Sequence, residues 1–151
     1  MIFLTALNWF TSKKTYLENA VGSTDDPEEI ERRKRLATKF WNSIDTNDVW
    51  MVLIMVAITT AICYTYFIPF NKKAGRHYLP SYCAVFGIGA ILLSFVATLL
   101  YCSLIVNINY DTSFIMKVAT INAIYSLLSY LILSFIFCNY SNTNAYRWFK
   151  L

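Results

Sequence analysis

Three long stretches of this sequence carry no charged side chain, and they constrain the fold more than any other feature. The stretches cover residues 50–70, 82–106 and 118–138. An α-helix of about 21 residues is about 31 Å long, which matches the hydrocarbon core of a bilayer. The chain is also 57% hydrophobic and only 15% charged, whereas soluble domains are about half apolar and a quarter charged. We therefore predict an all-α integral membrane protein with about three transmembrane helices, preceded by amphipathic juxtamembrane helices.

The remaining residues divide into polar segments around these spans. Residues 1–49 form an amino-terminal region of interfacial or soluble helices, residues 50–138 form the three-helix transmembrane domain, and residues 139–151 form an aromatic and basic interfacial tail. A turn that contains Lys72, Lys73 and Arg76 follows the first span, since three cations are costly in lipid. We expect anionic lipid headgroups, and not nucleic acid, to meet these basic groups because they flank apolar runs.

The amino-terminal region contains a strong helix start. Asp26 precedes Pro27 and two glutamates, a pattern in which the carboxylate caps exposed N–H groups and proline occupies the first helical position. We predict a helix over residues 27–44, with residues 45–48 breaking it and capping the first span. Three acid-to-base pairs lie four residues apart, which is the favourable orientation for ion pairs on a helix: Glu28 and Arg32, Glu29 and Arg33, and Glu31 and Arg35.

This helix is amphipathic, and its cations are placed to meet a membrane surface or a docking partner. The candidate docking residues are Arg32, Arg33, Lys34, Arg35, Lys39 and Trp41. A second amphipathic helix is predicted over residues 1–16, with Lys13 and Lys14 at its end. It is too short to cross a bilayer, so we expect it to lie in the interface.

The second span carries small side chains at spacings of three and four residues, which places them on one helix stripe. Those residues are Cys83, Gly87, Ala90, Ser94 and Ala97. Helices in lipid associate through close packing and interhelical hydrogen bonds, so the stripe predicts a helix–helix contact. The contact is made either with another span of the same chain or with a second protomer.

The third span carries polar side chains at helical spacing, namely Asn122, Ser126 and Ser129, and Thr60 in the first span is a candidate for the same surface. A buried amide in hydrocarbon needs a hydrogen-bond partner. These residues therefore face protein or water. Two interpretations remain open: polar contacts that hold helices together, or the lining of a pore that forms when copies assemble.

No arrangement of residues indicates an enzyme. The sequence lacks the GxSxG, Walker A, HExxH, CxxC and GxGxxG patterns. The single histidine, His77, has no cysteine or carboxylate at ligand spacing, so we expect neither a metal nor a cofactor. No carboxylate lies inside a span, which argues against a proton relay or a cation-coupled transporter.

Lysine and arginine give the orientation. Eight lie on the side of the amino terminus and five on the opposite side, so the positive-inside rule favours an amino terminus inside, and we interpret the chain as a multi-pass protein of a bacterial cytoplasmic membrane. Two functions fit. In the first, the chain self-associates into a pore or gated assembly; in the second, it is a membrane anchor or scaffold subunit of an envelope complex that docks a partner through the charged helix.

Overall fold

The computed structural model describes residues 12–22, 26–70, 80–105 and 111–138, and every element within them is helical. The elements are α2 (Lys13–Val21), α3 (Pro27–Thr65) with a π-helical turn at Tyr66–Phe70, α4 (Pro80–Ile105) and α5 (Thr112–Cys138). Three helices are long and apolar enough to cross a membrane, as the sequence predicts. The predicted interfacial tail, most of the turn after the first span and residues 1–11 lie outside the described residues.

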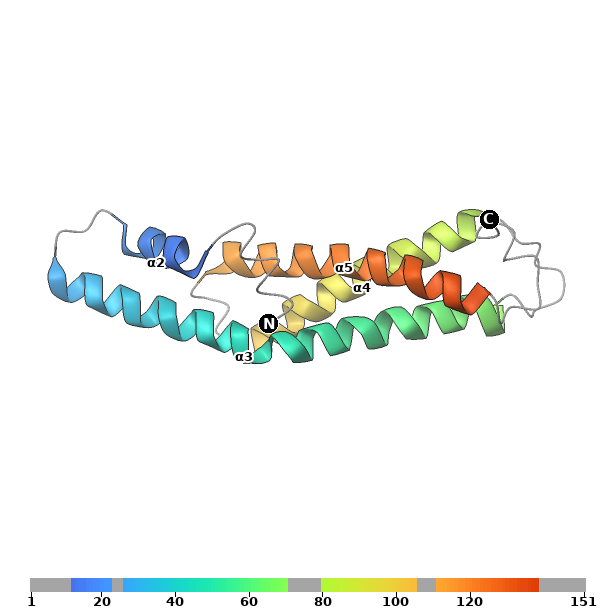
Figure 1. Ribbon diagram of the computed structural model, residues 1–151, viewed down its shortest axis with the longest axis horizontal. Helices are drawn as coiled ribbons and strands as arrows, with labels where there is room; N and C mark the ends of the chain where they lie inside the picture. Colours follow the sequence, from blue (N-terminus) through green and yellow to red (C-terminus); the bar gives the residue numbers. More distant parts are fainter. Residues whose placement is uncertain (1–11, 23–25, 71–79, 106–110, 139–151) are drawn as a thin grey trace.

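The longest element is α3, which runs along the full length of the molecule (Figure 1). It begins as predicted, since Asp26 caps it by accepting a hydrogen bond from the Glu28 amide at 3.1 Å, with Pro27 in the first position. Two of the three predicted ion pairs are present, Glu29 with Arg33 and Glu31 with Arg35. Because its first turn is stabilised in this way, the helix starts at a defined residue.

The predicted helix break at residues 45–48 is wrong, because α3 continues through them into the first span. Thr46 and Asn47 turn their side chains back to the carbonyls of Asn42 and Ser43, at 2.8 Å each, so neither caps a new helix. Asp48 is buried, on the same stripe as Ile44 and Met51. Tertiary packing of this stripe outweighs the weak local preference of four polar residues for a break.

The apolar end of α3 widens into the π-helical turn around Pro69. Proline lacks an amide N–H, and its ring clashes with the carbonyl four residues earlier, so the regular helix cannot continue past it unchanged. Tyr66 and Phe67 are buried there, and the ring of Tyr66 packs with those of Phe67, Phe70 and Phe86. An aromatic cluster therefore closes this end of the bundle.

The three long helices pack side by side, with α4 antiparallel to both α3 and α5 (Figure 1). Contacts of Thr59 with Ser126, and of Cys63 with Tyr130, are both offset by 67 residues. The same offset places residues 118–137 beside 51–70. In α4, the hydrogen bonds of Ser94 to Ser126 and of Thr98 to Asn122 place residue 82 opposite 138 and residue 102 opposite 118. The first and third uncharged stretches thus begin and end at nearly the same two levels, and the second begins at one of these levels and continues past the other.

The short helix α2 lies against the amino-terminal half of α3, near the start of α5 (Figure 1). The prediction of one helix over residues 1–16 is wrong, because Ser12 is extended and caps a separate helix at Lys13–Val21. Lys13 and Lys14 therefore start this helix, and no helix ends at them. The ring of Tyr16 packs against Trp41 of α3 at 5.4 Å and against Phe114 of α5 at 4.8 Å. These rings join the three elements outside the uncharged stretches.

Candidate functional site

A seam of buried hydroxyl groups runs through the contact between the three long helices. Its centre is Ser126, whose Oγ lies 3.1 Å from Thr59 Oγ1 of α3 and 2.9 Å from Ser94 Oγ of α4. Ser126 also donates to the carbonyl of Ala90 at 3.2 Å. All four residues are fully buried. One small hydroxyl therefore links all three helices.

The seam continues toward both ends of the bundle. On one side, Asn122 donates its amide to Thr98 Oγ1, and Thr98 donates to the carbonyl of Ser94 at 2.8 Å. On the other side, Tyr130 donates to the carbonyl of Cys83 at 3.0 Å. The carbonyl oxygen of Asn122 has no hydrogen-bond partner among the described residues. Every group in the seam is neutral, so it supplies hydrogen bonds between helices and offers neither an acid nor a base.

The predicted polar surface divides in the structure. Asn122 and Ser126 are buried inside one chain, whereas Ser129 and Thr60 are only half-buried and take part in none of the seam's hydrogen bonds. A water-filled lumen along Asn122 and Ser126 would therefore require α4 and α5 to separate. Within the described residues, no group of three histidine, cysteine or acidic side chains is placed to hold a metal ion.

The small-residue stripe of α4 lies against α5 of the same chain. Gly87, Ala90 and Ser94 are buried, while Cys83 and Ala97 are half-buried. The buried residue at this level of the stripe is Thr98, one position after Ala97, and the predicted stripe did not include it. A spacing of four from Ser94 would have found it. The stripe therefore makes an intramolecular contact, and what a second copy would touch stays a prediction.

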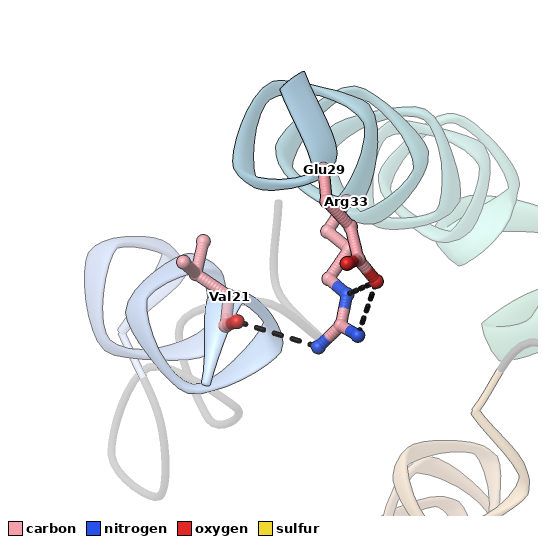
Figure 2. A network of polar contacts seen from close by, with 3 residues as sticks. All are labelled: Val21, Glu29 and Arg33. Carbon is pink, nitrogen blue, oxygen red and sulfur yellow. Dashed lines mark hydrogen bonds and ion pairs between the residues drawn. The ribbon is translucent and has the colours of Figure 1, made fainter. Parts of the chain in front are cut away.

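The candidate docking residues of α3 also divide. Trp41 is wrong as a surface residue, because it is buried between Tyr16 and Phe114. Arg33 points toward α2, where its guanidinium donates to the carbonyl of Val21 at 3.4 Å (Figure 2). The same guanidinium also binds Glu29 of its own helix. Trp41 and Arg33 both hold the amino-terminal elements together. Arg32, Lys34, Arg35 and Lys39 remain exposed, as a docking role requires.

Three of these exposed cations share one shallow face of α3 with Glu31, Thr38 and Asn42. Lys13 of α2 joins them, since its ammonium donates to Asn42 Oδ1 at 3.1 Å. We call Lys13, Lys34, Arg35 and Lys39 the basic face. Arg35 is paired with Glu31, whereas Lys34 and Lys39 have no carboxylate within 4 Å among the described residues. The face therefore carries a clear excess of positive charge.

Comparison with protein families, curated proteins and solved structures finds no match to this chain. Any function must therefore be inferred from the geometry of the seam, the basic face and the apolar surface of the long helices.

The hydroxyl seam gives a test of which polar residues hold the bundle together. Replacing Ser126 with alanine removes bonds to two other helices, so we expect the free energy of unfolding to fall by about 1–2 kcal/mol, the upper range for such bonds in membrane proteins. The matched control is Ser129→Ala on the same helix, which is expected to change it by less than about 0.5 kcal/mol. Equal losses, measured by unfolding in mixed micelles, would contradict the seam's role.

Proposed function

We propose that the chain is a non-enzymatic membrane anchor of the bacterial cytoplasmic membrane, with its amino terminus inside, and that α2 and the first half of α3 dock a partner. Insertion is supported by the three long apolar helices and by the large hydrophobic side chains that they expose. On α4 these include Val85, Ile88, Leu92, Leu93, Val96, Leu100 and Leu104. So wide an apolar surface on a monomer needs lipid or protein to cover it.

The unbroken course of α3 carries the docking proposal. Because the same helix contains the first span and three of the four residues of the basic face, insertion of that span would fix the height and direction of the face relative to the membrane. The rings of Tyr16, Trp41 and Phe114 brace it against α2 and α5. A rigid presenting element loses little conformational entropy when it binds, and that favours affinity.

The height of the basic face favours a soluble partner over the lipid surface. Trp50 is 60% exposed and marks the start of the apolar stretch, and Arg35 lies about 22 Å further along the helix axis. The headgroup layer of a bilayer is only about 5–8 Å thick on each side. The basic face therefore extends beyond the headgroups, into the zone where an acidic protein surface would meet it.

Self-association into a pore stays a prediction, and the geometry of one chain gives it less support. The polar residues that would line a lumen are used within the bundle, where Ser126 bonds to Thr59 and Ser94. Expression of the chain is therefore expected to leave membrane potential unchanged. Collapse of the potential, lost in Asn122→Leu, would favour the pore and overturn the anchor.

Site-directed photo-crosslinking in host cells tests docking. A photoreactive residue at Thr38, on the basic face, is expected to give one discrete adduct in native membranes. Reversing two charges, Arg35→Glu with Lys39→Glu, is expected to lower its yield at least about tenfold, since charged pairs at an interface contribute a few kcal/mol. The readout is the adduct's mass and quantity, with identification by peptide sequencing.

Matched positions on the same helix make this experiment decisive. Leu36 is 45% exposed and lies off the basic face, so the same photoreactive residue there is expected to give no such adduct. Arg32→Glu, an exposed charge reversal outside the face, is expected to leave the Thr38 adduct unchanged. An adduct that forms equally from Leu36, or that survives reversal of the basic face, would refute docking by this surface.

A further inference from the structure

A cleft of about 470 Å³ opens where α2, α3 and the start of α5 meet. The polar residues that line it are Tyr16, Asn19, Arg33, Asp111, Ser113 and Lys117. This volume lies within the range of small-molecule sites in proteins. The cleft is separate from the basic face, because no residue of that face lines it.

The charged side chains in the cleft differ in whether an oppositely charged side chain is paired with them. Arg33 is held by Glu29, with its Nε and Nη2 at 3.0 and 2.5 Å from one carboxylate oxygen (Figure 2). Asp111 is fixed by two neutral donors, the Tyr16 hydroxyl at 3.2 Å and the Phe114 amide at 2.9 Å. Apart from the partial positive charge at the amino end of α5, which Asp111 caps, neither donor brings a positive charge to it. Among the described residues, no cation lies within 4 Å of Asp111 and no carboxylate within 4 Å of Lys117.

The two unmatched charges lie at different heights. The offset of 67 residues between α3 and α5 puts Lys117 level with Trp50, at the edge of the apolar stretch. Asp111 lies six residues earlier, about 9 Å further from the hydrocarbon along the helix axis, and Ser113 lies between them. A positive group thus lies at the start of the headgroup layer, and a negative group lies farther from the hydrocarbon.

We propose that this cleft binds the headgroup of a zwitterionic aminophospholipid, whose phosphate and primary ammonium are arranged in the same order from the hydrocarbon outward. Lys117 and the Ser113 hydroxyl bind the phosphate, as basic pockets between transmembrane helices do. Asp111 accepts hydrogen bonds from the ammonium, a group with three donors. The proposal rests on insertion of the three spans and not on docking of a partner.

Native mass spectrometry of the full chain in detergent tests this site. The protein is titrated with phosphatidylethanolamine, phosphatidylcholine and phosphatidylglycerol that carry identical acyl chains. We expect phosphatidylethanolamine to bind about fivefold more tightly than either, the effect of one charged contact near a membrane surface. Choline has no N–H to donate, and glycerol carries no cation.

Two variants assign the roles of the charges. Asp111→Asn keeps a side chain that can cap α5 and accept from Tyr16, and it is expected to abolish the preference for ethanolamine over choline and glycerol. Lys117→Gln is expected to weaken all three lipids about fivefold. Circular dichroism checks that both variants remain folded, so a loss of binding is not a loss of structure.

The remaining outcomes each decide the proposal. Equal binding of all three lipids by the native chain, or an unchanged preference in Asp111→Asn, would overturn it while leaving insertion and docking intact. Tighter binding of phosphatidylglycerol would mean that the cleft recognises only the phosphate, and it would also overturn the proposal. Soluble glycerophosphoethanolamine that binds as tightly as phosphatidylethanolamine would assign the cleft to a soluble phosphoamine and overturn the lipid ligand.

Discussion

Replacing Trp41 with alanine is expected to lower the free energy of unfolding by about 3–5 kcal/mol, the usual cost of removing a large buried aromatic side chain. Trp41 is 4% exposed, and its ring lies 5.4 Å from both Tyr16 and Phe114. The substitution leaves a cavity at the point where α2, α3 and α5 meet. Hydrogen exchange in detergent is therefore expected to show α2 amides losing protection, while the long spans keep theirs.

Trp50 provides the matched control, because it lies nine positions further along the same helix and is 60% exposed. Trp50→Ala is expected to change the free energy of unfolding by less than about 0.5 kcal/mol, as surface substitutions do. If the two alanine variants unfold alike, the rings of Tyr16, Trp41 and Phe114 do not hold α2 and the first half of α3 in place. The docking proposal would then lose the rigid element on which it depends.

The three long apolar helices were predictable because their signal is strong and local. An uncharged run long enough to cross a bilayer has few alternatives in a chain of this composition, and the described helices contain the first and third runs and residues 82–105 of the second. The start of α3 was predictable for a similar reason, since Asp26 and Pro27 act on the first turn alone. Features that depend on one segment are accessible from sequence.

Features that depend on contacts between segments were not predictable. The local sequence of residues 45–48 predicts a helix break. In the structure, Asp48 is buried in the packed stripe of α3, and Asn47 accepts a hydrogen bond from the Tyr101 hydroxyl at 3.0 Å. Trp41 was predicted to be a docking residue because the sequence does not show that Tyr16 and Phe114, which lie on other helices, cover its ring. Sequence spacing shows which face of a helix is apolar, but not what covers it.

The candidate site shows the same limit at finer scale. Spacing alone grouped Asn122, Ser126 and Ser129 on one face of α5, and only the first two are fully buried. Which hydroxyl becomes the link between helices depends on the register of α4, and a shift of one residue there exchanges Ala97 for Thr98. The register between membrane helices is set by close packing, so it depends mainly on where the smallest side chains allow two helices to approach.

Gly87 is the residue at which this packing is tightest, and Gly87→Val is expected to lower the free energy of unfolding by about 2–3 kcal/mol. A Cβ at this position would lie 3.1 Å from Cε1 and 3.4 Å from Cδ1 of Tyr130. The ring has little freedom to move away, because its hydroxyl donates to the Cys83 carbonyl one turn earlier in α4. The measurement is the unfolding free energy in mixed micelles, with Gly87→Ala giving a smaller loss.

Gly89 separates crowding from the general effect of adding a side chain to the helix. A Cβ there meets nothing within 4 Å, so Gly89→Val adds the same atoms to the same helix without touching α5, and it is expected to leave stability within about 0.5 kcal/mol of the native value. Equal losses at both positions would mean that valine perturbs α4 itself. A loss confined to Gly87 would instead show that the contact with Tyr130 sets the distance between α4 and α5, and through it the hydrogen bond that joins Ser94 to Ser126.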